Sequence, residues 1–117
     1  MKQFSVLFLT LLFVSFSGFA QKQYEIRTVA FYNLENLFDT ENDTLIDDES
    51  SPIMSIKGNK EAVYEQKLNN MAKVISEIGL AESHNSPVIL GVAEVENRKV
   101  LEDLVQTSFL KNKKYEI

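Results

Sequence analysis

Two polar side chains in this sequence follow apolar stretches and could bind a metal ion. Glu94 comes directly after the apolar run at residues 88–93, and Asn33 comes after the run at residues 29–32. Such runs are typical of buried strands, and ligands of open α/β sheets bind beyond the carboxyl ends of strands. Carboxylate and amide oxygens suit Mg²⁺, which usually takes one or two carboxylates and keeps several waters. The pattern therefore indicates a metal site, although many α/β domains carry an acid after a strand without binding a metal.

Two strands and the helix between them must position these residues. The first strand is predicted at residues 24–34 and the second at residues 88–93. A helix is predicted from residue 59 or 60 to about residue 80, because Asn59 is a favourable N-cap and Gly79 a favourable stop. Its apolar stripe, spaced as one helical face requires, consists of Tyr64, Leu68, Met71, Ile75 and Ile78, widened by Ala72 and Val74.

The rest of the chain continues the alternation of strands and helices. A second helix is predicted at residues 98–107, capped by Asn97. Its inner face is predicted to consist of Val100, Leu101, Leu104 and Val105. Residues 115–117 have the pattern of the beginning of a third strand. The order strand, long loop, helix, strand, helix and incipient strand predicts an α/β fold with parallel strands and right-handed crossovers.

The loop between the first strand and the first helix is strongly acidic. It is predicted at residues 39–59 and carries six acids among residues 39–49. Their spacing does not match an EF-hand calcium loop, which needs glycine at its sixth position and glutamate at its twelfth. A solvated acidic loop is therefore expected. His84 precedes the second strand at its amino end, so an ordinary surface histidine is expected there.

The first 20 of the 117 residues have the pattern of an export signal peptide. Lys2 precedes a mostly apolar stretch at residues 4–16, and small residues at positions 18 and 20 predict cleavage before Gln21. A retained membrane anchor is the alternative, but a membrane span needs roughly 20 apolar residues. The sequence has no cysteine, which excludes a lipid-modified lipoprotein and disulfides. We therefore expect export to the periplasm or the cell exterior, without stable membrane insertion after cleavage.

The composition limits the kinds of binding partner. Cleavage of residues 1–20 removes one lysine, so the net charge changes from −5 to −6. Such an acidic chain is not expected to bind nucleic acid through a general basic surface. A metal ion can still bridge carboxylates to a phosphate substrate. The remaining 97 residues (117 minus 20) suffice for one small domain but are few for a deep α/β active site.

Three segments carry a resemblance to a known family. Residues 31–39 read Phe-Tyr-Asn-Leu-Glu-Asn-Leu-Phe-Asp, and residues 91–98 read Gly-Val-Ala-Glu-Val-Glu-Asn-Arg. They resemble the first and second motifs of the endonuclease/exonuclease/phosphatase superfamily, which has the DNase-like fold. Residues 64–75 resemble the intervening helix of an exported bacterial branch of that superfamily. The three segments occur in the family's order and together cover most of residues 27–106.

The resemblance implies a Mg²⁺-dependent hydrolase of phosphodiester or phosphomonoester substrates, nucleic acid among them, with Mn²⁺ or Ca²⁺ as alternative cations. It implies that Glu94 binds the catalytic metal and that Asn33 helps to hold the metal or the scissile phosphate. It gives no role to Glu35, Glu96 or Asn97. Capping preferences offer the alternative that Glu96 and Asn97 only start the second helix. No protein partner can be inferred.

The family's fold is a four-layer α/β sandwich, in which two face-packed sheets are flanked by helices. Its later motifs, an Asp/Asn pair and a terminal Asp-His pair, do not occur in this sequence, and His84 precedes the second motif. Residues 24–117 are therefore expected to be the amino-terminal third of such a domain, a fragment without activity alone. A non-catalytic exported α/β binding module is the alternative. The genomic DNA downstream of Ile117 distinguishes the two.

Overall fold

The strands pair in parallel, as the sequence predicts. The structure is a computed structural model that describes residues 22–45 and 48–117, so the predicted signal peptide lies outside the described residues. Strand β1 (Val29–Leu37) and strand β2 (Ile89–Val95) form a two-stranded parallel sheet. Their register runs from Val29 opposite Ile89 to Asn33 opposite Ala93. The described residues therefore form a mixed α/β arrangement, consistent with part of the expected sandwich.

The helices begin where capping residues end the preceding loops. Helix α2 (Lys60–Glu77) starts after Asn59, whose side chain accepts a hydrogen bond from the Ala62 N–H at 3.1 Å. Helix α4 (Arg98–Gln106) starts after Asn97, which accepts from the Val100 N–H at 3.0 Å. Gly79 ends the first of these helices in the left-handed region, with a φ of 72°. The short helix α3 (Leu80–Ser83) and the 3-10 turn η1 (Lys111–Lys113) complete the set.

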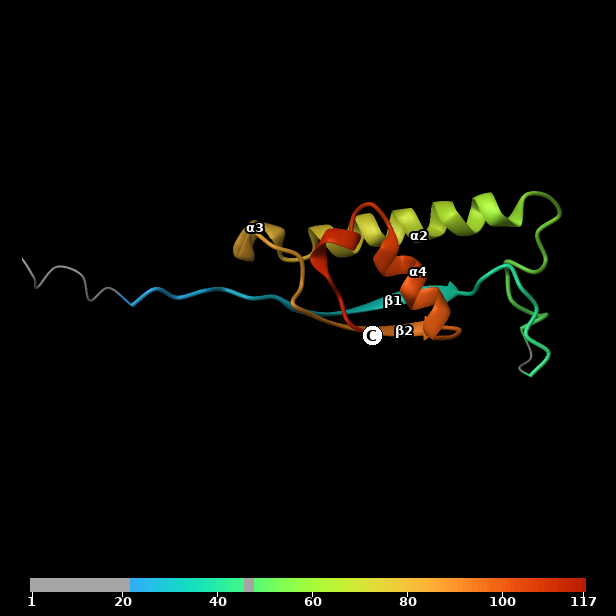
Figure 1. Ribbon diagram of the computed structural model, residues 1–117, viewed down its shortest axis with the longest axis horizontal. Helices are drawn as coiled ribbons and strands as arrows, with labels where there is room; N and C mark the ends of the chain where they lie inside the picture. Colours follow the sequence, from blue (N-terminus) through green and yellow to red (C-terminus); the bar gives the residue numbers. More distant parts are fainter. Residues whose placement is uncertain (1–21, 46–47) are drawn as a thin grey trace, which may run out of the picture.

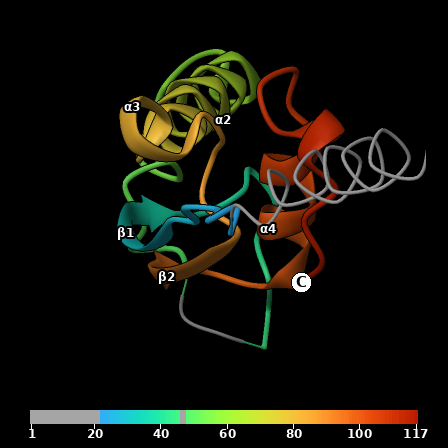
Figure 2. The ribbon, with the colours of Figure 1, turned by 90° about the vertical axis from the view of Figure 1, so that its left-hand side faces the viewer.

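The helices α2 and α4 cover one face of the sheet (Figures 1 and 2). The buried core joins the end of β1, the inner faces of both helices and the long loop, and it consists of Leu34, Leu37, Ile53, Tyr64, Leu68, Met71, Ala72, Ile75, Val100, Leu104 and Leu110. Each fully buried aliphatic side chain of this kind stabilises the fold by roughly 1.5–3 kcal/mol. The same packing fixes the strand ends, because Leu34 and Leu37 have no exposed surface.

The opposite face of the sheet is apolar and exposed. Val29, Phe31 and Ile89, called here the bare sheet face, are 68%, 70% and 62% exposed. A Cβ on Gly91 would lie 2.8 Å from the ring of Phe31, so the glycine makes room for that ring across the strand pair. Among the described residues no helix has both the length and the apolar character needed to cross a membrane.

The element boundaries differ from the sequence predictions at the strands. Residues 24–28, expected in the first strand, are not in a strand, and β1 extends to Leu37 instead of ending at residue 34. Strand β2 extends to Val95, two residues beyond the expected end. Strand limits depend on the partner, and the pairing of β1 with β2 begins at Val29 and Ile89. The apolar stretch alone does not show where pairing begins.

Two further predictions about apolar residues were wrong. Val74, expected in the stripe of the first helix, is 42% exposed. Residues 115–117, expected to begin a third strand, form no strand. The Tyr115 hydroxyl instead donates a hydrogen bond to the Pro87 carbonyl, and its ring packs against the core. The aromatic residue therefore covers the core from the side instead of joining the sheet.

The acidic loop is not simply solvated, which corrects another prediction. Asp39 and Asp48 are buried, at 6% and 1% exposure. Asp48 Oδ2 accepts a hydrogen bond from the Asp43 N–H at 2.8 Å, and Asp39 Oδ1 accepts from the Glu41 N–H at 2.8 Å. These carboxylates hold loop backbone in place, which a count of acids in the sequence does not reveal. The buried Ile53 ties the same loop to the core.

Candidate functional site

The two residues that the sequence analysis singled out lie in contact. Asn33 Nδ2 donates a hydrogen bond of 2.8 Å to Glu94 Oε1, although the two residues are 61 positions apart. They meet because Asn33 pairs with Ala93 in the parallel register, which places Glu94 one residue beyond it. Both side chains are exposed, where the regular pairing of the two strands ends.

The orientation of the Asn33 amide follows from its partners. Its Oδ1 accepts a hydrogen bond from the Glu35 N–H at 2.7 Å, and its Nδ2 faces the carboxylate of Glu94. A flipped amide would set oxygen against carboxylate and N–H against N–H, so only this orientation satisfies both neighbours. The amide oxygen is thus engaged with backbone, and the amide nitrogen holds one oxygen of Glu94.

The backbone around these residues is strained. Glu35, Asn36 and Glu94 have φ values of 50°, 55° and 55°. A non-glycine residue in this region costs about 1–3 kcal/mol, and such residues cluster at functional sites. The register also shifts between Asn33 and Leu37, which marks a bulge in β1, and bulges are common next to active sites. Of the three strained residues only Asn36 is of a type that favours this conformation.

Lys67 is a residue of this region that sequence reasoning missed. It lies on α2 and donates hydrogen bonds to the carbonyls of Glu35 and Asn36, the second at 2.9 Å. Burial lowers the pKa of Lys67, and the carboxylates of Glu35 and Glu94 oppose that change. It lies three residues after Tyr64, at the flank of the apolar stripe, and no signal in the sequence connects it to residues 35 and 36.

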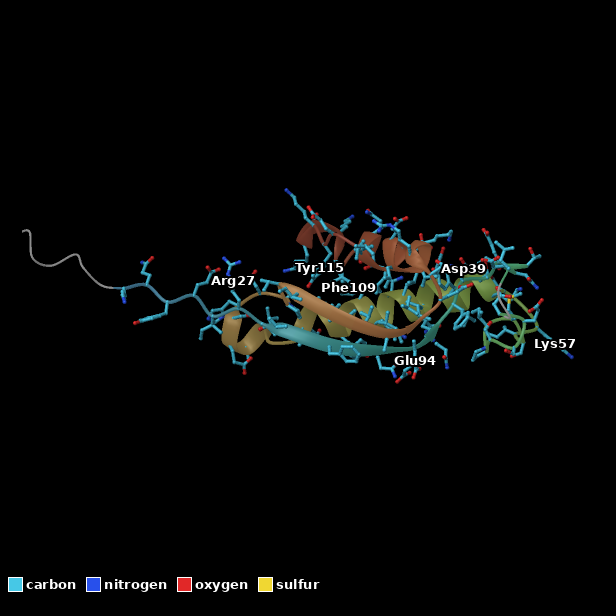
Figure 3. The ribbon with its side chains drawn as sticks, turned by 90° about the horizontal axis from the view of Figure 1, so that it is seen from below. Arg27, Asp39, Lys57, Glu94, Phe109 and Tyr115 are labelled. Carbon is cyan, nitrogen blue, oxygen red and sulfur yellow. The ribbon has the colours of Figure 1, made fainter. Side chains whose placement is uncertain are left out.

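A second polar cluster lies on the other side of the strand ends, where Figure 3 labels Asp39 well apart from Glu94. Glu96 Oε2 accepts a hydrogen bond of 2.9 Å from the Asp39 N–H. Burial raises the pKa of Glu96, and the Asp39 carboxylate adds to that rise, while the hydrogen bond from the Asp39 N–H opposes it. Lys99 lies 3.7 Å from the Asp39 carboxylate and 2.9 Å from that of Asp103.

The same cluster includes Tyr64, whose hydroxyl donates to Asp103 at 2.9 Å. Burial and the adjacent carboxylate raise the pKa of Tyr64 above its ordinary value. These contacts join α2 to α4 and give the cluster a structural role. Asn97 caps α4, in agreement with the capping alternative given for Glu96 and Asn97 in the sequence analysis. Glu96 accepts a hydrogen bond from the backbone of the acidic loop.

The donor set at Asn33 and Glu94 fits a magnesium-type ion of the kind that the family resemblance implies. In the described part of the chain, no group of three or more His, Asp or Glu side chains converges as a metal site. Mg²⁺ does not need such a group, because it usually binds one or two carboxylates and retains waters. The bond from Asn33 holds one oxygen of Glu94, and the carboxylate offers two. Glu94 therefore fits as the charged ligand.

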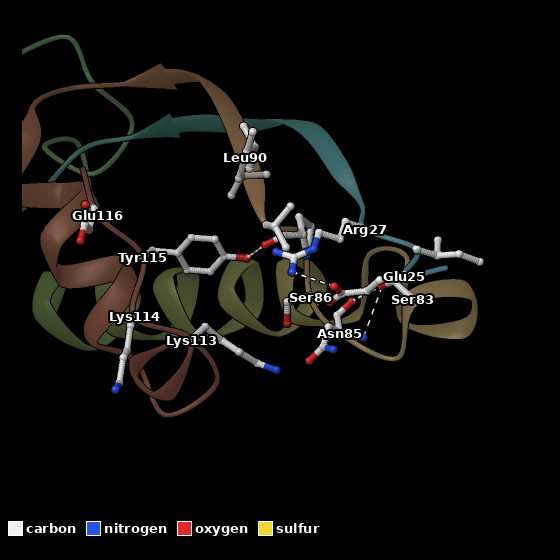
Figure 4. A pocket seen from close by; sticks show the side chains of 14 residues that line it. Glu25, Arg27, Ser83, Asn85, Ser86, Leu90, Lys113, Lys114, Tyr115 and Glu116 are labelled. Carbon is white, nitrogen blue, oxygen red and sulfur yellow. Dashed lines mark hydrogen bonds and ion pairs between the residues drawn. The ribbon is translucent and has the colours of Figure 1, made fainter. Parts of the chain in front are cut away.

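His84 and a hollow of about 630 Å³ lie at the other end of the strands. His84 is exposed at the end of α3. The hollow is lined by Arg27, Ser86, Tyr115 and their neighbours, at the amino ends of both strands (Figure 4). Neither feature is near Glu94, so the strand-end geometry, and not the size of a pocket, identifies the candidate site. This placement agrees with the expectation of a surface histidine.

Comparison with known proteins gives one match. A model of the Endonuclease/Exonuclease/phosphatase family matches residues 28–117, which is more than half of the chain and includes β1, α2, β2 and α4. No curated protein and no solved structure matches the chain.

Proposed function

Because the chain belongs to the endonuclease/exonuclease/phosphatase family, we propose that it forms the metal-binding part of a Mg²⁺-dependent phosphodiester hydrolase. Members of this family are generally hydrolytic, depend on divalent metals and act on phosphodiester substrates. The single observation that carries the proposal is the hydrogen bond between Asn33 and Glu94, at the point where the regular pairing of β1 and β2 ends.

In this proposal Glu94 is the charged ligand and Asn33 aligns it. A bound divalent cation polarises a phosphoryl oxygen and offsets charge that develops on the leaving oxygen. Asn33 donates to one carboxylate oxygen and so fixes the direction of the other. Glu94 has strained backbone, and its side chain is exposed to solvent. Mn²⁺ and Ca²⁺ are alternative ions for the same oxygen ligands.

A binding module that holds a cation without hydrolysis is the second candidate. It is favoured by the exposure of Asn33 and Glu94 and by the distance of His84, the only histidine, from them. Phosphodiester turnover separates the two candidates, because a binding module binds the ion and leaves the ester intact. Nucleic acid and smaller phosphodiesters or phosphomonoesters are the substrate classes to compare.

The test is the substitution Glu94→Gln, which keeps the shape of the side chain and removes its charge. Hydrolysis of bis(p-nitrophenyl) phosphate by the protein from the complete reading frame should fall by about 10²-fold or more, since metal stabilisation is worth several kcal/mol. High Mg²⁺ should restore part of the loss. In the present chain, binding of Mn²⁺ followed by electron paramagnetic resonance should weaken about tenfold or more, because the charged ligand is lost.

His84→Ala is the matched control, since a surface substitution away from the site has little effect. Its turnover should stay within about twofold of the unchanged protein. Normal turnover and normal Mn²⁺ binding by Glu94→Gln would remove the basis of the proposal. A large loss in His84→Ala would place the active site at the other end of the strands.

Export belongs to the proposal as well. The pattern of residues 1–20 supports delivery to the periplasm or the cell exterior, with residues 24–117 as the folded part. Mass spectrometry of protein recovered from an exporting host should give Gln21 as the new amino terminus. Intact Met1 in the membrane fraction would contradict it.

A further inference from the structure

We propose that Lys67 is a positioning residue for Glu94, acting through the backbone turn at Glu35 and Asn36 and through the amide of Asn33. The inference rests on the proposed function, in which Glu94 is the charged metal ligand. No motif pointed to Lys67. The assignment comes from hydrogen bonds that link its ammonium group to the Glu94 carboxylate through the backbone of Glu35 and the side chain of Asn33.

The first link is the turn that the lysine holds. Lys67 Nζ donates to the carbonyls of two successive residues, Glu35 and Asn36. Both residues lie in the left-handed region, with φ values of 50° and 55°. Two successive strained residues persist only where surrounding contacts hold them. An ammonium group, with three donors and a full charge, supplies such contacts to two carbonyl oxygens at once.

The second link connects the turn to the metal ligand. The N–H of Glu35, the first of the two left-handed residues, donates to Asn33 Oδ1 at 2.7 Å. This bond fixes the rotation of the Asn33 amide, whose Nδ2 then meets Glu94 Oε1 at 2.8 Å. If the turn relaxed, Asn33 would lose its acceptor contact and with it the orientation that holds Glu94.

The third link is the rigid base from which Lys67 extends. Its neighbours on α2, Leu68 and Met71, are in the buried core, at 6% and 7% exposure. The Lys67 side chain is partly buried. Together with Tyr32 and Glu35 it lines a shallow hollow. The helix therefore fixes the stem of Lys67, and the carboxylates of Glu35 and Glu94 oppose the lowering of its pKa by burial. The alternative is a lysine that only covers apolar surface with its stem.

The experiment compares Lys67→Met with Lys67→Arg in the purified chain, with Lys73→Met as the matched control. Lys73 lies on the same helix and is exposed. Lys67→Met keeps most of the apolar stem and removes the charge and the donors, so Mn²⁺ affinity should fall about tenfold, as for other outer groups that orient a metal ligand. Lys67→Arg keeps charge and donors and should recover most of that loss. Lys73→Met should bind Mn²⁺ like the unchanged chain.

A second measurement tests the positioning role of Lys67 in the absence of metal. The side-chain amide resonances of Asn33, assigned by their loss in Asn33→Ala, should shift in Lys67→Met and stay in place in Lys67→Arg and Lys73→Met. A lysine that only covers apolar surface would leave them unchanged in all three variants. Unchanged Asn33 resonances together with normal Mn²⁺ binding in Lys67→Met would overturn the inference.

The two proposals fail in different ways. If Glu94→Gln binds Mn²⁺ normally, the proposed function is wrong, and the metal-free Asn33 resonances alone decide whether Lys67 positions the pair. If Glu94→Gln weakens binding and Lys67→Met changes neither Mn²⁺ binding nor the Asn33 resonances, the site assignment stands and the role of Lys67 is wrong.

Discussion

Glu94 and Glu96 are separated by one residue, but they lie in different surroundings and have different roles. Glu94 is exposed and contacts Asn33, whereas Glu96 is partly buried and accepts a hydrogen bond from the backbone of Asp39. Residues two apart in a regular strand share a face, so the left-handed backbone at Glu94, with a φ of 55°, separates the two side chains. Acidic residue type alone therefore does not identify the ligand in the sequence Glu-Val-Glu.

The raised pKa of Glu96 makes a prediction about pH. Burial is the largest cause of the rise and favours the protonated form of Glu96 in the folded chain. The pKa of Glu96 in the folded chain therefore lies above the ordinary value of 4.5. The stabilising contribution of this group is then fully present below pH 4.5 and is lost as pH rises through the folded pKa. Glu96→Gln removes this dependence and can still accept from Asp39. The variant should gain stability relative to the unchanged chain as pH rises through that window.

Urea unfolding at a series of pH values measures the difference. Glu65→Gln, an exposed substitution on α2, should stay within about 0.5 kcal/mol of the unchanged chain at each pH. A Glu96→Gln variant that loses stability relative to the unchanged chain as pH rises would show that the native state favours the charged form of Glu96.

At the scale of elements, the junction of α2 and α3 depends on one glycine. Gly79 has a φ of 72°, and a Cβ there would lie 2.1 Å from Thr28 Oγ1. Thr28 is held by its own hydrogen bond to Ser83, at 3.2 Å, and precedes β1. The glycine therefore lets the end of the helix pack against the start of the strand.

Gly79→Ala should lower the free energy of unfolding by about 2 kcal/mol or more, from backbone strain and from the clash with Thr28. Gly58→Ala is the matched control. Gly58 also has a positive φ, of 146°, but nothing lies within 4 Å of an added Cβ. The loss of stability in Gly58→Ala should come from backbone strain alone and should be smaller than the loss in Gly79→Ala. Equal costs in urea unfolding would mean that the contact with Thr28 is unimportant.

Local signals in the sequence predicted the helices well. Asn59, Asn97 and Gly79 mark helix ends through contacts within a few residues, and the structure has the caps and the stop where they were expected. The parallel order and the proximity of Asn33 to Glu94 followed from the alternation of strands and helices. These features depend on periodicity and on short-range chemistry, which a single sequence contains.

Features that depend on distant partners could not be predicted. The limits of β1 depend on where β2 pairs, and the burial of Asp39 and Asp48 depends on how the loop folds on itself. The contacts of Lys67 with Glu35 and Asn36 join segments more than 30 residues apart. The residue type does not predict such a contact, because a lysine on a helix usually faces solvent.

At the scale of the whole molecule, the described structure covers its sheet on one side only. Helices pack on one face, and the bare sheet face of Val29, Phe31 and Ile89 stays exposed. An exposed apolar face on a two-stranded sheet is unfavourable, and sheets this small are marginal without further packing. We therefore expect low stability and self-association of residues 21–117 expressed alone.

Phe31→Ser should reduce this association, because it removes the largest apolar side chain of the bare sheet face. Sedimentation velocity at micromolar to millimolar concentration, where such surfaces aggregate, measures the effect. Tyr24→Ser is the matched control, since Tyr24 is 87% exposed but precedes the strand. A monomer with a sharp cooperative melt before any substitution would show that residues 21–117 form an independent domain.

The separation of Asn33 from Glu94 along the chain has a consequence for when a cation can be bound. During synthesis Asn33 emerges 61 residues before its partner, and the two meet only after the long crossover closes, which costs loop entropy. An incomplete or unfolded chain therefore lacks the pair. A chain that is exported before it folds would take its metal from the compartment in which it arrives. The ion supply of the destination, and not that of the cytoplasm, would then decide which cation the protein carries.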